Sequence, residues 1–327
     1  MKTIFGPVPS RRFGKSLGID LSPEKKQCNF DCLYCELATA KPVENIENPP
    51  TVDEVILELQ TALKEHPDID VITITANGEP TLYPHLDELI DKIDSIKSRY
   101  KTLILTNAST IGDRNIQKTL AKLDTVKLSL DCVTPDCFKK LDRPIKSINL
   151  QSICNGIVEF RKLYNKELIL EILMVKGINS TDKEIEAFNR VLSSINADRI
   201  DIGSVDRPPA YPIEPLSYAE LLEIAQKFNP SLPIHIASRH KAKEAKSSFS
   251  NEEILSTLQK RPLTMDDIQT LFDEDSLSRF AKLLDEKKVK IKQVGTLKFY
   301  GIDFSKKNEK FFQNPLTKEK FCNIISA

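Results

Sequence analysis

The chain has 327 residues, and its 47 basic residues balance its 47 acidic ones, so no global charge excess draws it to nucleic acid or to an anionic membrane. Its length allows one large domain, or a domain with an added module, and a substantial core. The start, MKTIFGPVPSRRFGK, lacks the apolar run of a signal peptide, and no later run reaches the length of a membrane span. These features predict a cytoplasmic protein.

Short apolar runs alternate with longer segments of helical period between about residues 17 and 203. The runs predict six strands: SLGID, VITIT, TLILT, VKLSL, ELILEILMV and RIDIG. Strands that alternate with helices favour parallel pairing, and near-continuous apolar runs suit strands covered on both faces. The pattern predicts an α/β fold, either a barrel or an open sheet.

Helix starts are marked by three capping boxes, in which a hydroxyl and a carboxylate satisfy each other's backbone amides. The boxes pair Thr51 with Glu54, Thr181 with Glu184 and Ser217 with Glu220. They place helices after the predicted strands.

The pattern changes near residue 248. Three helical segments, EEILSTLQK, TMDDIQTLF and LSRFAKLLDEKK, precede KVKIKQVGTLKFYGI, which alternates around Gly295 like a hairpin. Three helices followed by a hairpin are typical of a winged helix. We expect an α/β domain over 1–240, a winged-helix-like module over 248–303 and a C-terminal tail over 304–327.

The segment from 287 to 320 contains ten lysines against three acidic residues, with aromatic residues between them. Basic and aromatic side chains together are typical of surfaces that bind nucleic-acid backbones and unstacked bases. A solvated lysine-rich face and a protein-docking module are the alternatives.

The most distinctive stretch is QCNFDCLYCEL, in which Cys28, Cys32 and Cys35 follow the spacing C-x3-C-x2-C. Seven unevenly spaced cysteines in a reducing compartment argue against a disulfide framework and favour metal or redox chemistry. A structural zinc ion needs a fourth ligand nearby, but the nearest further candidates are His66 and Cys132. An iron-sulfur cube normally has four protein ligands, so three cysteines leave one iron open. An iron-sulfur cluster is favoured, with zinc or buried free thiols as alternatives.

CNFDCLYC resembles the cluster-binding motif of radical S-adenosylmethionine (radical SAM) enzymes. In that superfamily the amino and carboxylate groups of S-adenosylmethionine chelate the open iron of a [4Fe-4S] cluster, and an electron from the cluster yields a 5′-deoxyadenosyl radical. The resemblance implies that Cys28, Cys32 and Cys35 hold the cluster and that Tyr34 lies against the adenine. It also implies a partial (β/α)6 TIM-like barrel and a reductant such as flavodoxin or ferredoxin.

A second similarity follows the second predicted strand. Asn77, Gly78, Glu79 and Pro80 resemble the superfamily's Gly-Gly-Glu-Pro segment, whose residues contact the methionine amine. A cationic amine needs acceptors, which carbonyls and a carboxylate supply. Asn77 departs from the usual first glycine.

Polar residues also end the third and fourth predicted strands. Asn107, Ser129 and Asp131 are similar to strand-end residues that line the ribose and carboxylate of the cofactor in this superfamily. The carboxyl ends of parallel strands meet on one side of an α/β fold, where such folds place their chemistry. We therefore expect these residues and the cysteine loop to converge.

Candidate substrate contacts are Lys176 and Arg207, which follow the fifth and sixth strands, although such residues are often simply solvated. The segment FGPVPSRRFGKSLGID resembles an uncharacterised branch of the superfamily that is loosely related to wybutosine-synthesis enzymes. Arg11 and Arg12 in this segment either face the site or brace the first strand.

The remaining cysteines near the predicted pocket are Cys132, Cys137 and Cys154. They are expected to be small buried hydrophobic residues rather than ligands of an auxiliary cluster, because their spacing fits no ferredoxin pattern.

Taken together, these motifs predict a radical SAM enzyme that modifies a substrate. RNA or tRNA is the first candidate substrate, motivated by the wybutosine resemblance and the basic C-terminal region. A peptide or small metabolite is the second. An iron-sulfur transcription sensor, whose winged helix would bind DNA, is the alternative from another class.

Overall fold

The computed structural model describes residues 2–10, 12–205, 207–236, 246, 248–260, 262–294 and 297–302. The chain divides into two compact units. The first comprises residues 1–35 and 40–244, and the second comprises residues 36–39 and 245–327. No helix in the described part of the chain is both long and apolar enough to cross a membrane.

The first unit is built on an eight-stranded sheet in which the strands follow one another in chain order. β1 and β2 pair antiparallel, and every later neighbouring pair is parallel. The strands are β1 (Ile4–Ser10), β2 (Gly14–Asp20), β3 (Val71–Thr75), β4 (Lys101–Thr106), β5 (Thr125–Ser129), β6 (Glu167–Met174), β7 (Arg199–Ser204) and β8 (Ile234–Ile236). The six predicted strands correspond to β2 through β7, which confirms them.

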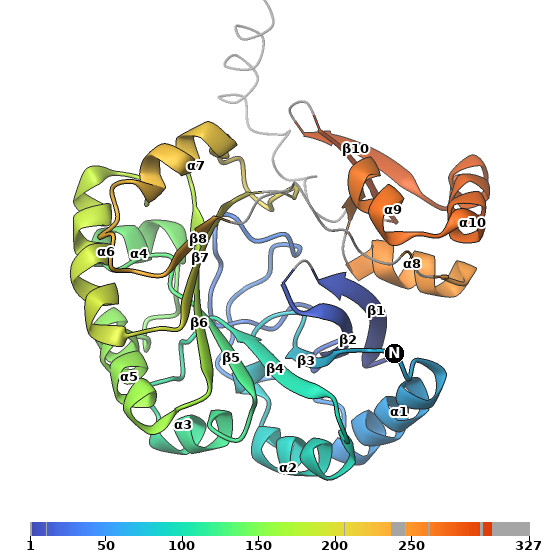
Figure 1. The fold of residues 1–327 in the computed structure, drawn as a ribbon, viewed down its shortest axis with the longest axis horizontal. Helices are drawn as coiled ribbons and strands as arrows, with labels where there is room; N and C mark the ends of the chain where they lie inside the picture. Colours follow the sequence, from blue (N-terminus) through green and yellow to red (C-terminus); the bar gives the residue numbers. More distant parts are fainter. Residues whose placement is uncertain are drawn as a thin grey trace, which may run out of the picture. The chain divides into compact units, whose positions relative to one another are not determined.

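Helices follow most of the parallel strands. They are α1 (Val52–Glu65), α2 (Leu86–Ile96), α3 (Arg114–Leu120), α4 (Pro135–Leu141), α5 (Leu150–Leu163), α6 (Asp182–Ile195) and α7 (Tyr218–Ala225), with a short 3₁₀ helix, η1 (Pro80–Leu82). Figure 1 shows α1, α2, α3, α5 and α6 along the outer side of the curved sheet. Outward residues such as Ile72, Val126 and Leu170 are fully buried in the core beneath these helices. The α/β class is confirmed, and the mostly parallel sheet is consistent with a partial barrel.

Two strands of the sheet, β1 and β8, are not predicted from the sequence. β1 contains Pro7 and Pro9, which lack the amide hydrogen that a central strand needs, and β1 lies at the edge of the sheet, where proline is tolerated. β8 has only three residues, too few for an alternating pattern to be recognised.

Two of the three predicted capping boxes are complete, those of Thr51 with Glu54 and Ser217 with Glu220. At the start of α6, Thr181 accepts a hydrogen bond from the amide of Glu184, but the Glu184 carboxylate does not return one to the cap. The carboxylate instead accepts hydrogen bonds from the segment that links β5 to α4. The third box is therefore only half formed.

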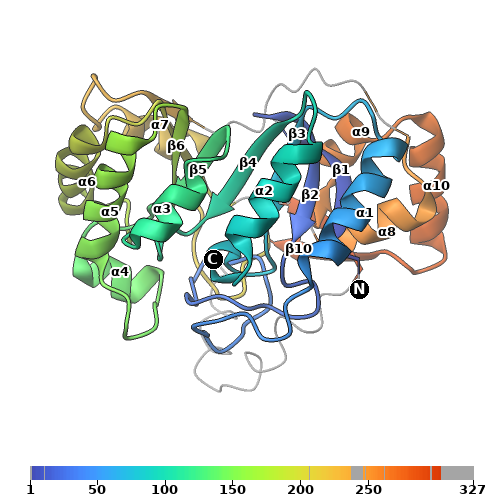
Figure 2. The ribbon, with the colours of Figure 1, turned by 90° about the horizontal axis from the view of Figure 1, so that it is seen from below.

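The segment between β2 and α1 contains the three clustered cysteines and no helix or named strand. Figure 2 shows this dark blue loop at the end of the sheet toward which the β4 arrow points. The loop therefore lies at the carboxyl ends of the parallel strands, as the sequence predicts.

The second unit consists of α8 (Asn251–Lys260), β9 (Leu263–Thr264), α9 (Met265–Leu271), α10 (Glu274–Asp285), β10 (Lys290–Val294) and β11 (Leu297–Gly301). Its three strands form an antiparallel sheet in the order β10-β11-β9. Phe249, Leu258, Phe272 and Phe280 form a separate buried core. The three predicted helices and the hairpin are confirmed, β9 is an addition, and the tail at 304–327 lies outside the described residues.

Candidate functional site

The cysteine loop is attached to the end of β3 by backbone hydrogen bonds. The amide of Gln27 donates to the carbonyl of Asn77 at 2.8 Å, and the amide of Glu79 donates to the carbonyl of Gln27 at 3.0 Å. Gly78 lies between these bonds at φ +148°, and a Cβ there would lie 1.7 Å from the carbonyl oxygen of Gln27. Only glycine permits this close approach. Two motifs that the sequence presents separately are thus one structural element.

The three clustered thiols are free, and nitrogen donors surround two of them. The ammonium of Lys26 lies 3.2 Å from Sγ of Cys35. The side-chain amide of Asn107 lies 3.6 Å from Sγ of Cys28, and the backbone amide of Phe30 lies 3.4 Å from the same sulfur. Hydrogen bonds to sulfur and nearby positive charge are how proteins tune iron-sulfur clusters.

Burial disfavours the thiolate form of two of the three thiols, Cys28 and Cys32. Burial raises the pKa of Cys28 to about 12, with a further contribution from the charge of Glu79. Burial also raises the pKa of Cys32 well above its usual value. A metal bound by Cys28 and Cys32 would therefore displace their protons.

The spacing of the sulfurs separates a cluster from a single zinc ion. Three thiolates on one zinc at about 2.3 Å would lie within about 4 Å of one another. In the described part of the chain, only Cys132, Cys137 and Glu184 bring three such ligand atoms within 4.8 Å, so the three loop sulfurs are more widely spaced. The donor set thus fits a multi-iron cluster better than one zinc ion.

Glu79 is 1% exposed, and its carboxylate already accepts four hydrogen bonds. The amide and hydroxyl of Thr81 donate to Oε1 at 2.9 and 2.7 Å, and the hydroxyl of Thr106 donates to the same oxygen at 2.5 Å. The amide of Asn107 donates to Oε2 at 2.7 Å. These bonds join η1 to the end of β4 and so place Asn107 beside Cys28. A contact between Glu79 and a cofactor amine stays a prediction, with Oε2 the oxygen that has spare capacity.

Asp131 joins the cysteine loop to the sheet. Its carboxylate accepts hydrogen bonds from the hydroxyl of Tyr34 and, at 2.6 Å, from the amide of Leu173. Burial raises the pKa of Asp131 to about 7, although both hydrogen bonds oppose this. Ser129, two residues earlier, is half-buried on the inner face of the sheet. Cofactor contacts by Tyr34, Ser129 and Asp131 stay predictions.

The candidate substrate contacts have partners within the protein. Lys176 is 44% exposed and forms ion pairs with Glu214 at 3.0 Å and Glu220 at 2.9 Å. Arg207 is half-buried in the connection between β7 and α7. These ion pairs account for the position of Lys176 without a ligand.

Of the two N-terminal arginines, Arg11 lies outside the described residues. Nη1 of Arg12 lies 2.8 Å from Oε1 of Glu171 and 2.7 Å from Oδ2 of Asp201. Arg12 therefore braces the hairpin of β1 and β2 against β6 and β7, and it does so on the inner face of the sheet.

The expectation that Cys132 and Cys137 are free thiols is wrong. They form a disulfide with a Cα–Cα distance of 5.5 Å, because the turn from β5 into α4 brings them together. Cys154 is free and buried in α5, as predicted. Composition argues against a disulfide framework, but it does not exclude one local pair.

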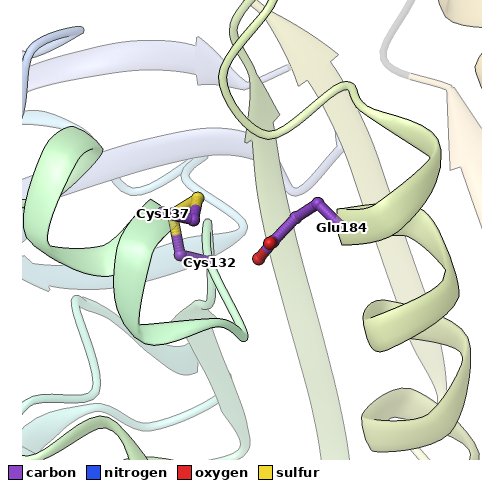
Figure 3. Close-up of side chains that lie close together, drawn as sticks. All are labelled: Cys132, Cys137 and Glu184. Carbon is purple, nitrogen blue, oxygen red and sulfur yellow. A yellow bond between two sulfur atoms is a disulfide. The ribbon is translucent and has the colours of Figure 1, made fainter.

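Glu184 lies beside this disulfide, as Figure 3 shows. Its carboxylate accepts hydrogen bonds from the amides of Val133 and Thr134 at 2.7 and 3.1 Å and from the Thr134 hydroxyl at 2.6 Å. Paired sulfurs and a carboxylate with three donors do not form a metal site, so nothing among these residues supports an auxiliary cluster.

Sequence reasoning missed three residues in or near the cysteine loop. Lys26 contacts Cys35, and Asn29 accepts a hydrogen bond from Asn107 at 2.9 Å. The charge of the buried Asp142 adds to burial in raising the pKa of the Cys32 thiol. The positions of Lys26 and Asn29 next to the cysteine motif could have identified them from the sequence. Asp142 is distant from the motif in sequence, so the sequence gives no indication of its role.

Comparisons with known proteins agree with this geometry. A family model described as the radical SAM superfamily matches residues 26–192. The chain is 41% identical over 299 residues to a UPF0026 protein from Helicobacter pylori, a match that covers 91% of this chain and 96% of that protein. It is 35% identical over 288 residues to a Brachyspira hyodysenteriae protein described as GTPase Obg, covering 86% of this chain and 42% of that protein.

Among solved structures, the fold is similar to that of a radical SAM methyltransferase from Sphaerobacter thermophilus, with a TM-score of 0.53 and 14% sequence identity. The match covers 69% of this chain and 67% of that one, and it concerns the fold alone. The chain therefore belongs to the radical SAM superfamily and is an enzyme of that class, with a [4Fe-4S] cluster and S-adenosylmethionine as its cofactors.

Proposed function

We propose that Cys28, Cys32 and Cys35 hold the cluster and that the enzyme cleaves S-adenosylmethionine reductively to modify a substrate. The supporting observation is the hydrogen-bonded network that unites the cysteine loop, the Asn77–Pro80 segment and Asn107 at the carboxyl end of the sheet. When bound, the cluster supplies the electron for cleavage of the sulfonium. The chain's own task is to position both cofactors and to exclude water.

The residues proposed to contact S-adenosylmethionine surround this network. Their backbone carbonyls and polar side chains offer acceptors for an amine and donors for a carboxylate and ribose. They are Tyr34, Asn77, Gly78, Glu79, Pro80, Asn107, Ser129 and Asp131.

Anaerobic reconstitution with iron and sulfide, followed by reduction in the presence of S-adenosylmethionine, tests the proposal. We expect 5′-deoxyadenosine to form even without substrate. An iron-sulfur transcription sensor would load iron but release no 5′-deoxyadenosine. Loading of zinc in place of iron, without product, would contradict the proposal.

Replacing Lys26 with methionine is expected to lower the reduction potential of the cluster by on the order of 50 mV. The change removes a buried positive charge and an N–H···S contact of 3.2 Å, both of which favour the reduced cluster. If the reduced cluster loses about 1.4 kcal/mol of stabilisation relative to the oxidised one, its one-electron reduction potential falls by roughly 59 mV. Redox titration monitored by electron paramagnetic resonance gives the potential.

Lys25→Met is the matched control, because Lys25 is 57% exposed and pairs with Glu47. Its potential should stay within experimental error of the unmodified protein. Equal potentials for both variants would show that Lys26 does not contact the cluster.

We propose RNA as the substrate class, recognised through the second unit as a winged-helix-like module. The order α8, α9, α10, β10 and β11 supports this module, and its hairpin carries the exposed Lys290 and Lys298. A peptide or small metabolite is the second candidate, favoured by the neutral overall charge.

Replacing both Lys290 and Lys298 with glutamate, which reverses their charge, should weaken RNA binding by at least about tenfold and reduce its salt dependence. Each phosphate contact to a single strand contributes about 0.7 to the slope of log K against log salt. Fluorescence anisotropy with a labelled tRNA at several salt concentrations measures both quantities. The control reverses Lys118 and Lys139, exposed residues of α3 and α4. If the two double variants lose RNA affinity equally, or if neither loses any, a peptide or small metabolite would be favoured as the substrate.

A further inference from the structure

The inner face of the sheet carries a group of charged side chains that the cofactor site does not use. Four of them come from β5, β6 and β7, and the fifth comes from the turn between β1 and β2. We call this group the inner-wall cluster, and its members are Arg12, Lys127, Glu171, Arg199 and Asp201.

Strand alternation places the cluster on the side of the sheet away from the helices. Leu128, Leu170 and Ile200 are each next in sequence to a member of the cluster, and all three are fully buried in the helix-covered core. On the inner face, Ser129 and Leu173 are only partly buried. Lys127 is two residues before Ser129 on β5, about 7 Å along the strand. The cluster therefore lies close below the proposed cofactor contacts.

The cluster carries more positive than negative groups. Oε1 of Glu171 lies 2.5 Å from Nζ of Lys127 and 2.8 Å from Nη1 of Arg12, and Arg12 also pairs with Asp201. Burial opposes ionisation of Glu171, but the charges of Lys127 and Arg12 lower its pKa to about 2. With Arg199 included, three cations face two carboxylates, which leaves one positive charge without an anionic counterpart within the cluster.

Arg199 has unused hydrogen-bond donors. Its Nε and Nη2 atoms are buried and have no hydrogen-bond partner. Nε lies 3.3 Å from Oδ1 of Asp201, close enough for an ion pair but without hydrogen-bond geometry. Nε and Nη2 form one edge of the guanidinium, the edge that binds two oxygens of a carboxylate or phosphate at once. The guanidinium carbon lies over the ring of Phe13, 5.3 Å from its centroid, in a cation–π contact.

We propose that the inner-wall cluster binds an oxyanion group of the substrate, a carboxylate or a phosphate, through the guanidinium of Arg199, whose side chain is 21% exposed and whose Nε and Nη2 atoms lack hydrogen-bond partners. Arg12 and Lys127 supply the additional positive charge, and Glu171 and Asp201 hold these cations in position. The assignment of the anion to the substrate rests on the proposed function, whereas the binding of an oxyanion does not.

Calorimetric titration of the reconstituted enzyme with inorganic phosphate and, separately, with succinate tests the site. We expect one of them to bind with a dissociation constant below roughly 10 mM. The stronger ligand identifies the oxyanion as phosphate or carboxylate. Arg199→Gln should weaken that binding at least tenfold, and Arg199→Lys should restore only part of it, because lysine keeps the charge and loses the fork. Arg190→Gln, a change at an exposed position on α6, is the control and should bind as the unmodified enzyme does.

A measurement on the unmodified enzyme covers the case in which both Arg199 variants fail to fold. With ¹⁵N-labelled arginine, the preferred anion should shift at least one Nε–H resonance that is protected from exchange. Absence of binding by both anions, unchanged affinity in Arg199→Gln, or no shifted resonance would each overturn the site. Anion binding without cleavage of S-adenosylmethionine would refute the proposed function and leave this site intact. Cleavage of S-adenosylmethionine without anion binding would refute this site and leave the proposed function intact.

Discussion

Replacing Cys32 with alanine is expected to abolish both the visible absorbance of the cluster and the formation of 5′-deoxyadenosine. Cys32 is 9% exposed and lies among buried residues of the core, and alanine at this position offers no ligand atom for iron. Loss of a direct ligand should reduce the amount of 5′-deoxyadenosine by more than about 100-fold. Substitution of residues that only hydrogen-bond to metal ligands typically costs up to about 100-fold. Iron and sulfide analysis and chromatography of 5′-deoxyadenosine measure the two effects.

Cys154→Ala is the matched control, because Cys154 is an equally buried free thiol in α5 that does not belong to the loop. It should lose about 1 kcal/mol of stability and keep its iron and its product. If Cys32→Ala still assembles a four-iron cluster and makes 5′-deoxyadenosine, the ligand assignment is wrong.

Gly78→Ala is expected to unfold the carboxyl end of the sheet or to lose the cluster. The new Cβ would lie 1.7 Å from the carbonyl oxygen of Gln27 and 2.4 Å from its carbon, and the backbone angle of +148° is one that side chains rarely adopt. Because both obstacles are backbone features, relief requires the cysteine loop to leave β3. We expect a loss of more than about 4 kcal/mol in denaturant unfolding, together with low iron content.

The control for this change is Gly177→Ala. Gly177 also has a positive φ, +70°, but a Cβ there meets no atom within 4 Å. Its cost should be about 1 kcal/mol, the strain of a left-handed residue alone. Comparable losses in the two variants would mean that the loop tolerates displacement from β3.

The sequence predicts the parallel strands and the cysteine loop because both depend on local pattern. Continuous apolar runs identify β2 through β7, and the order of strands then brings Asn107 near Cys28. The antiparallel edge strand is missed because Pro7 and Pro9 normally mark loops.

Long-range side-chain pairing is the part that the sequence does not reveal. Lys127, Glu171 and Asp201 interrupt apolar strands, and each by itself resembles an ordinary polar position on a strand. Their connection through Arg12 depends on how strongly the sheet curves, which no local pattern specifies. The Cys132–Cys137 pair is missed for a different reason, since the tight turn after β5 brings the sulfurs together whatever the average composition suggests.

The bonds of Gln27 to Asn77 and Glu79 make the cysteine loop, the proposed site of the cluster, an extension of the sheet itself. Free energy gained when iron binds is therefore shared with the folding of the strands behind it. In a cell starved of iron, this coupling would deplete the protein through proteolysis rather than leave a pool of intact molecules waiting for metal. Its abundance would thus follow the iron supply.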